Sequence, residues 1–398
     1  MRRPSRLQPP PQPTTCPMEF DYAWLLLAFP LAFALGWLAS RLDLRQLRFE
    51  NRQAPKAYFR GLNFLLNEQQ DQAIDAFIEA VQNDPDTCEL HFALGNLFRR
   101  RGEYDRAVRV HEHLMSRGDL SHADHNRAQH ALALDFLKAG LLDRAEVALR
   151  KLEGTSYQEE ARLALLSIYE RSRDWAPATE IAGKLDGSSR GSFGVRQAHY
   201  LCEQALASVS SGDTEQALLL LQQANRLAPG AARPLIEKAK LEHQLGRNTE
   251  AFNTLTLVEQ AAPQAMPLAA ALLAQVAKSC GQQTIALEKL KNNYDTLPSV
   301  DVVEAIIQLG NDTRSARDWY VKHLETQPSL LAASRWIAGE HFENEQPHSL
   351  VQRALDQATK PLMRYRCAAC GFEATQHFWH CPGCQAWDSY PSRRIEEL

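Results

Sequence analysis

Apolar residues between about residues 56 and 360 recur at the three- and four-residue spacings of amphipathic helices. Within residues 90–115 the pattern predicts a helix that Gly102 ends, because glycine adopts the left-handed conformation at little cost. A second helix is predicted from Tyr104 to Met115. Two such helices cannot cover their own apolar faces, so neighbouring pairs are expected to stack. The apolar face of the first helix is formed by Leu90, Leu94 and Leu97 or Phe98.

The helical pairs repeat along the chain with a period near 34 residues. The clearest marker is an alanine five residues after a turn residue, and its successive spacings are 34, 38, 33, 39, 34, 35 and 30 residues. We expect alanine here because the two helices of a pair cross closely. A proline twelve residues later in five copies prevents the second helix from continuing. The alanines are Ala73, Ala107, Ala145, Ala178, Ala217, Ala251, Ala286 and Ala316, and the prolines are Pro85, Pro229, Pro263, Pro298 and Pro328.

This pattern resembles the tetratricopeptide repeat over residues 56–360, and an unrelated helical bundle is the alternative interpretation. The resemblance implies an all-α fold, a tetratricopeptide-repeat superhelix. Stacked helical repeats present a long concave surface, and such surfaces bind peptides or protein segments.

A different pattern occupies the N-terminus. Residues 1–17 are rich in proline and arginine and are predicted to form a disordered tail, so that translation starts either at Met1 or at Met18. Residues 22–40 contain no charged side chain. Their length fits one helix across a hydrocarbon core of about 30 Å. We therefore predict a transmembrane anchor over residues 18–41 that contacts the membrane through residues 22–40.

Six basic residues follow this segment between Arg41 and Arg60, whereas at most three precede it. The positive-inside rule then places the C-terminal part in the cytoplasm, and a cleaved signal peptide with export of the remainder is the alternative. Small residues recur every fourth position in the segment, which would allow a second membrane helix to approach closely. These small residues are Ala28, Ala32, Gly36 and Ser40.

Four of the eight cysteines lie close together near the C-terminus, as two C-x2-C pairs in a predicted module at residues 361–392, called the knuckle below. Four thiolates in a tetrahedron suit zinc or a single iron ion, and they fill its coordination shell, so we predict a structural site. Gly371 and Gly383 are expected to supply permissive backbone near the pairs, and His377 and His380 to be packing or surface residues. The predicted metal ligands are Cys367, Cys370, Cys381 and Cys384, and the aromatic residues expected around the metal, or against the last repeats, are Tyr365, Phe372, Phe378, Trp379 and Trp387.

Composition and motifs argue against nucleic-acid binding and give no sign of catalysis. The net charge of −4 gives no basic excess of the kind expected for nucleic-acid binding. The remaining cysteines are widely spaced, which favours a reducing compartment over a disulfide framework. His111 and His113 flank a glutamate but do not form the H-E-x-x-H protease signature, and we expect the histidines at 122, 125 and 130 to lie on a solvated helix face. No nucleophile and base stand out, so the sequence gives no case for an enzyme.

A membrane anchor, helical repeats and a terminal knuckle, in this order, resemble the lipopolysaccharide assembly protein B family of Gram-negative bacteria. The resemblance covers nearly the whole chain from Met18 and is carried by residues 61–77, 94–115 and 365–387. It implies a rubredoxin-like knuckle that binds iron, with zinc as an equally reasonable metal. It also implies a single-pass inner-membrane adaptor whose repeats lie on the cytoplasmic side.

The same resemblance implies partners. Such an adaptor would help a membrane-bound AAA+ protease degrade the deacetylase that commits precursors to lipid A. It would also gather other lipopolysaccharide-synthesis or transport proteins at the membrane. Two other interpretations stay open from the sequence alone, namely a rubredoxin-like electron-transfer protein and a periplasmic repeat scaffold.

Overall fold

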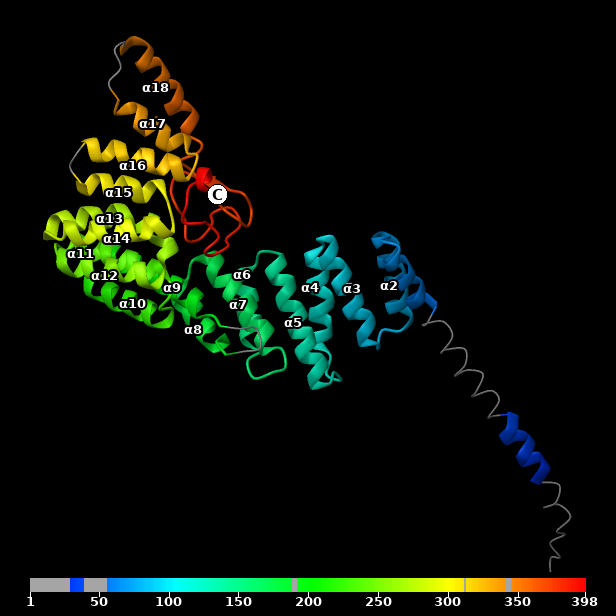
Figure 1. Cartoon of the computed structure of the whole chain (residues 1–398). Helices are drawn as coiled ribbons and strands as arrows, with labels where there is room; N and C mark the ends of the chain where they lie inside the picture. Colours follow the sequence, from blue (N-terminus) through cyan, green and yellow to red (C-terminus); the bar gives the residue numbers. More distant parts are fainter. Residues whose placement is uncertain (1–28, 39–55, 188–191, 311–312, 341–344) are drawn as a thin grey trace, which may run out of the picture. The chain divides into compact units, whose positions relative to one another are not determined.

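The computed structural model describes residues 29–38, 56–187, 192–310, 313–340 and 345–398 (Figure 1). The N-terminal tail and most of the predicted anchor, including Ala28 and Ser40, lie outside these residues, as does Cys16. Residues 29–38 are helical and include Ala32 and Gly36. No helix within the described ranges combines the length and the apolar character needed to cross a membrane.

The chain divides into two compact units, Met1–Ala148 and Leu149–Leu398. In the first unit residues 56–66 are helical, and the next four helices pack successively against one another. One core lies around Phe77 and Phe98, and a smaller one lies around Phe92 and Leu114. These helices are α2 (Gln70–Asn83), α3 (Cys88–Arg101), α4 (Tyr104–Ser116) and α5 (His122–Lys138), and α6 (Leu142–Arg150) runs across the boundary between the units.

In the second unit each helix packs against its successor. Its largest core runs from α11 to α15. The helices are α7 (Gln158–Ser172), α8 (Trp175–Leu185), α9 (Gly194–Ser210), α10 (Thr214–Leu227), α11 (Ala232–Gln244), α12 (Asn248–Ala261), η1 (Pro263–Ala265), α13 (Met266–Cys280), α14 (Gln283–Thr296), α15 (Val300–Gly310), α16 (Thr313–Thr326), α17 (Leu330–Ala338) and α18 (Glu345–Thr359). The knuckle and η2 (Ile395–Glu397) follow, drawn in red in Figure 1.

The predicted repeat register agrees with these helices. Seven of the eight marker alanines are 0% exposed, which fits a close helix crossing at that position, and Ala316 is partly buried. The predicted pair in residues 90–115 is found as α3 and α4, with Gly102 between them in the left-handed conformation at φ 85°. Each of the five prolines lies just beyond the end of a helix, namely α2, α10, α12, α14 and α16. The all-α repeat fold is thus confirmed.

Turns without glycine keep the same backbone conformation. Three of the eight copies have another residue than glycine at the turn, namely Glu68, Arg173 and Asn311, and Asn311 lies outside the described residues. Glu68 and Arg173 both adopt positive φ, at 59° and 57°. The left-handed conformation costs an L-residue roughly 1–2 kcal/mol, so the surrounding helix pair imposes it. The geometry of the turn is therefore retained where the glycine signal in the sequence is lost.

A buried polar cluster joins three helices of the first unit. His111 of α4 is 0% exposed and contacts the carboxylate of Asp135 on α5, which also accepts a hydrogen bond from Arg99 of α3 at 2.8 Å. Gly95 makes room for this histidine, because a Cβ at position 95 would lie 2.5 Å from the imidazole ring. His113 is exposed, so the two histidines lie on different helix faces.

Replacing Arg173 with glycine should raise the stability of the second unit by about 1 kcal/mol, since it removes the cost of the left-handed residue while glycine's greater unfolded-state entropy offsets part of the gain. The midpoint of urea unfolding, followed by far-UV circular dichroism, would measure this. Arg171→Gly, inside the last turn of α7, is the matched control and should lower the midpoint. A lower midpoint for Arg173→Gly would contradict the prediction.

Candidate metal centre

Two short hairpins carry the four clustered cysteines. In the first hairpin β1 (Tyr365–Arg366) and β2 (Glu373–Ala374) pair antiparallel, with Tyr365 opposite Ala374. In the second hairpin His380 and Trp387 form an isolated antiparallel bridge. Pairs of this length leave no periodic signal, which is why the sequence did not predict them.

The two cysteine loops close in the same way. The N–H group four residues after the first cysteine of each pair donates to the carbonyl of that cysteine, from Gly371 to Cys367 and from Gln385 to Cys381, both at 2.9 Å. Gly371 and Gln385 are also the left-handed residues of the loops, at φ 77° and 60°. Each loop thus aims two sulfurs toward the other loop.

Gly383 serves a different purpose from the one predicted. It has no positive φ, because the left-handed position of its loop is taken by Gln385. A Cβ at position 383 would lie 3.3 Å from the Cβ of Phe372, so glycine here permits close packing of the two loops. Phe372 itself is 44% exposed, which corrects its assignment to the core around the metal.

The four sulfur atoms lie within 4.8 Å of one another. The distance between the sulfurs of Cys367 and Cys384 is 3.8 Å, and that between Cys370 and Cys381 is 3.7 Å. A tetrahedral ion with metal–sulfur bonds of about 2.3 Å holds its sulfurs about 3.8 Å apart, so this donor set fits one zinc or iron ion. Among the described residues no other group of histidine, cysteine and carboxylate side chains is arranged to hold a metal.

Hydrogen bonds to sulfur favour ionisation at one ligand. Burial raises the pKa of Cys367. Hydrogen bonds from the Ser389 hydroxyl at 3.3 Å and from backbone N–H groups outweigh this effect and lower the pKa to about 6. A backbone hydrogen bond from Phe372 lowers the pKa of Cys370, but burial and the neighbouring thiols raise it to about 12. Four adjacent thiolates repel one another. They can be ionised together only when a bound metal ion supplies the balancing positive charge.

The knuckle has a small core beside the sulfurs. Cys367 and Cys381 are buried with Tyr365 and Tyr390, and Phe378 packs against them. Cys370 and Cys384 are exposed, so one edge of the site faces solvent.

The two histidines of the knuckle lie outside the sulfur cluster. His377 lies edge-on to Tyr365 and Trp379, and its Nε2 lies 3.1 Å from the carbonyl of Tyr390. His380 stacks on Trp387 with a ring-centroid distance of 4.2 Å. Burial lowers the pKa of both histidines. The structure thus gives both of them packing contacts.

Trp387 connects the repeats to the second hairpin (residues 380–387), called the metal loop below. Its indole stacks on His199 of α9 with ring centroids 4.7 Å apart and meets Trp175 of α8 edge-on. The indole Nε1 donates to the carboxylate of Glu170 on α7 at 3.0 Å. The same carboxylate accepts a hydrogen bond from Arg196 at 2.7 Å. The knuckle therefore docks on α7 to α9, in the middle of the array, and not on the last repeats alone.

The neighbouring Asp388 extends this contact. Its carboxylate lies 2.7 Å from Nε2 of His199, and the other ring nitrogen of that histidine lies 3.3 Å from the guanidinium of Arg233. Arg233 is 3% exposed and donates to Glu203 at 2.6 Å. A chain of polar contacts thus runs from the metal loop into α11.

The C-terminal segment (residues 393–398) ties the knuckle to later helices. Glu397 accepts from the N–H of Val300 at the start of α15, and Glu396 accepts from the N–H of Leu331 at the start of α17. Carboxylates at helix N-termini satisfy free N–H groups and complement the helix dipole. Arg394 donates to Asp301 at 2.6 Å. The segment therefore contacts two successive repeats.

Sequence reasoning found the ligand cysteines but missed their partners in the repeats. Glu170, His199 and Arg233 lie on helices whose polar residues look like ordinary solvated positions in the sequence. One signal was available, because a histidine and an arginine at positions that should face the core require polar partners. No sequence signal singled out Glu396 or Glu397.

Comparison with known families agrees with this architecture. The pattern of the rubredoxin metal binding domain matches residues 365–390. Patterns of the tetratricopeptide repeat match residues 90–122 and 208–276. Both predicted modules are therefore recognised independently of their geometry.

Full-length relatives cover both modules. A protein of Escherichia coli K12 called lipopolysaccharide assembly protein B is 30% identical over 385 residues, which is 94% of this chain and 99% of that protein. The Haemophilus influenzae protein of the same name is 26% identical over 92% of this chain and 96% of its own length. Among solved structures, a tetratricopeptide repeat protein from Parabacteroides merdae aligns with 65% of this chain and 99% of its own at 15% identity, with a TM-score of 0.33.

Replacing Trp387 with alanine should release the knuckle from α7 to α9 while the four cysteines remain. A large buried aromatic side chain contributes about 3–5 kcal/mol, and Trp387 is partly buried, so we expect the lower end of this range. Hydrogen exchange at residues 375–390 should become faster, with metal content unchanged. Phe372→Ala removes an exposed aromatic ring from the same module and is the control; equal exchange in both variants would refute the docking role of Trp387.

Proposed function

Because this chain belongs to the lipopolysaccharide assembly protein B family, we propose that it is an inner-membrane adaptor that regulates lipopolysaccharide biosynthesis. The observation that carries the proposal is 30% identity across both the repeats and the knuckle, over 94% of the chain. A repeat array is suited to this work because its stacked helices offer a large surface for other proteins.

The finer proposal concerns proteolysis. We infer that the adaptor presents the deacetylase that commits precursors to lipid A to a membrane-bound AAA+ protease, and that it gathers other lipopolysaccharide-synthesis or transport proteins. The support is the family resemblance together with a repeat fold suited to binding other proteins. Binding and presentation would then be the chain's contribution, and the bond cleavage would belong to the protease.

Attachment to the membrane is part of the same proposal. Residues 18–41 would form the anchor, and the basic residues after it would hold the repeats on the cytoplasmic side. The small residues of the segment would face a partner's membrane helix. A reporter fused after residue 398 distinguishes this orientation from a periplasmic scaffold, because a phosphatase reporter is active only in the periplasm.

The knuckle would act as a structural element. Cys367, Cys370, Cys381 and Cys384 would hold one iron or zinc ion, which supplies the positive charge that stabilises four adjacent thiolates. With four protein ligands the shell is closed, so the chain offers no position for a substrate at the ion. The protein residues then do the remaining work, since Trp387 and Asp388 hold the metal loop against the repeats.

One observation favours electron transfer as a second candidate. Cys370 and Cys384 are exposed, so an iron ion held by these sulfurs would lie near the protein surface. Only iron would serve this function, because zinc has no accessible redox change.

Deleting residues 18–40 should leave a folded protein that no longer lowers deacetylase levels in cells, because the protease is reached in the membrane. Immunoblotting of the deacetylase in a strain that lacks the endogenous adaptor would measure this. The control replaces residues 18–40 with an unrelated membrane helix of equal length, which should restore part of the activity. If the soluble fragment acts as well as the full chain, the membrane part of the proposal is wrong.

Replacing all four knuckle cysteines with serine should remove the metal and loosen the contact with α7 to α9. Metal analysis of the full chain should give one ion per chain before the change and none after it, and hydrogen exchange at Trp387 should rise. Cys280→Ser, at a partly buried thiol outside the knuckle, is the control.

The same purified chain decides between the two functions. A visible absorption spectrum distinguishes iron, which is coloured with thiolate ligands, from colourless zinc. A chain that contains zinc and still lowers deacetylase levels removes the electron-transfer candidate. A folded chain with no metal at all would overturn the structural role of the knuckle.

A further inference from the structure

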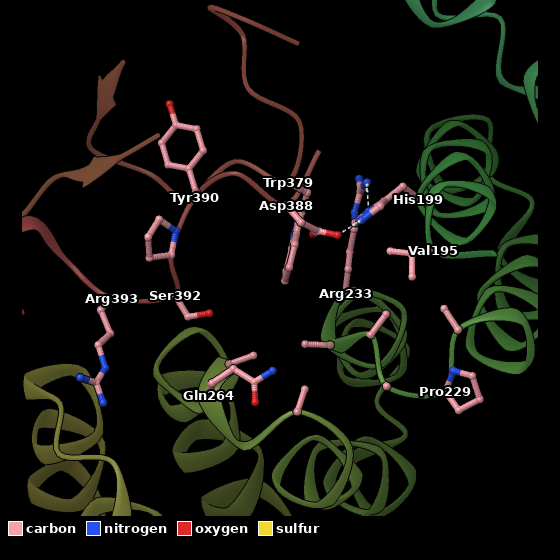
Figure 2. A pocket seen from close by; sticks show the side chains of 17 residues that line it. Val195, His199, Pro229, Arg233, Gln264, Trp379, Asp388, Tyr390, Ser392 and Arg393 are labelled. Atoms are coloured by element: carbon pink, nitrogen blue, oxygen red, sulfur yellow. Dashed lines mark hydrogen bonds and ion pairs between the residues drawn. The ribbon is translucent and has the colours of Figure 1, made fainter. Parts of the chain in front are cut away.

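A cavity of about 770 Å³ lies between the knuckle and the repeats of the second unit (Figure 2). Its knuckle side is formed by Trp379, Asp388 and residues 390–393, and its repeat side by the start of α9 and the loops at 228–233 and 262–265. Sites for bound molecules in proteins range over about 300–1,000 Å³, so the cavity is large enough for a ligand.

The repeat side of the cavity is periodic. Ala228 and Ala231 line it in one loop, and Ala262 and Ala265 occupy the same positions in the next loop, each 34 residues later. Small side chains leave the backbone of both loops close to the cavity. The two loops place equivalent alanines side by side along the cavity. Such a surface suits a ligand that is a chain of similar units, because successive units meet equivalent apolar positions.

The knuckle side presents unpaired backbone. Pro391, Ser392 and Arg393 line the cavity in an irregular segment. Within the described part of the chain, the N–H groups of Ser392 and Arg393 and the carbonyls of all three residues have no hydrogen-bond partner. An extended peptide binds such a segment by main-chain hydrogen bonds, as a strand adds to a sheet edge.

Most charged side chains at the cavity already have a partner. Asp388 is bound to His199, and Arg233 is bound to Glu203. Arg393 lines the cavity with no ion pair among the residues that the structure describes, although its charge acts on the nearby Glu397. The first turns of α9 and α11 also line the cavity, and at α9 the N–H of Gly194 already donates to the Ser192 hydroxyl at 3.2 Å. Arg393 is therefore the charged side chain at the cavity with which a ligand carboxylate can pair.

We propose that this cavity binds an extended segment of a client protein in which an apolar side chain lies next to an acidic one. The apolar side chain would occupy the alanine-lined floor against Trp379, and the carboxylate would pair with Arg393. The free amide of Gln264, across the cavity from Ser392 in Figure 2, would bond to the peptide backbone. This inference rests on the proposed adaptor function and assigns it a binding site.

Peptide fits these walls better than a small anion. A phosphate ion would use the positive charge but neither the apolar floor nor the unpaired backbone of residues 391–393. A purely apolar ligand would leave Arg393 without a partner. Only a polypeptide supplies main-chain hydrogen bonds, an apolar side chain and a carboxylate together.

The test uses the full metal-containing chain in detergent and fluorescein-labelled hexapeptides with blocked termini. The probe is Gly-Ser-Leu-Glu-Ser-Gly, and the comparisons replace its Leu by Ser or its Glu by Lys. Fluorescence anisotropy should give an affinity for the probe about tenfold higher than for either comparison, a difference typical of one close charge pair or one buried side chain. Inorganic phosphate, added while the ionic strength of the assay buffer is held constant, should not displace the probe.

Two variants locate the binding. Ala231→Leu should fill the floor and weaken probe binding about tenfold, and Arg393→Glu should reverse the preference toward the Lys peptide. Arg353→Glu, on an exposed face of α18, is the matched control and should bind as the unchanged chain does. Circular dichroism and metal content establish that each variant is folded.

Equal affinity for the Glu and Lys peptides, displacement by phosphate, or full affinity in Ala231→Leu would overturn the proposed site. These outcomes are separate from failure of the proposed function. If Ala231→Leu also lowers deacetylase levels in cells as well as the unchanged chain does, the adaptor function stands and the client binds elsewhere. If the unchanged chain has no effect on deacetylase levels, the adaptor function itself fails.

Discussion

The contact between Trp387 and the pocket formed by Glu170, Trp175 and His199 fixes the knuckle against α7, α8 and α9. Trp387 lies three residues beyond Cys384, so the closure of the sulfur cluster fixes the position of the indole. An indole N–H that is buried needs an acceptor, and Glu170 supplies it. The metal loop and the repeat helices are thus parts of one packed structure, and the cavity beside Trp379 exists because this contact is made.

Local signals explain why so much of the fold could be predicted. The spacing of Ala107 from Gly102 reports a helix crossing and a left-handed turn, and both are set within a dozen residues. The two C-x2-C pairs are equally local, because each loop closes on itself before it meets the other. Where the glycine is missing, as at Arg173, the backbone conformation is still imposed by the two helices, so periodicity was the better guide.

The contacts that create the candidate site are not local, and for this reason the sequence did not reveal them. Glu170 and Trp387 are 217 residues apart, and Asp388 meets His199 across 189 residues. Nothing in the helix pattern distinguishes Glu170 from the acidic residues on solvated faces. Gly383 failed as a prediction for a related reason, since its use is set by Phe372 of the other loop and not by its own turn. Pairings between distant segments require the folded arrangement.

The bond between Glu170 and Trp387 also changes how the array can come apart. In an open array each repeat touches only its neighbours, so the terminal repeats fray first and the rest follow one by one. Here Trp387 is hydrogen-bonded to Glu170 of α7, and Arg394, a few residues later, is paired with Asp301 of α15. The knuckle thus links the two ends of the intervening set of helices. Helices α8 to α14 cannot separate one at a time while both contacts hold. The closed segment should therefore melt as a single cooperative block, and its assembly must wait for an encounter between ends that are far apart in the chain.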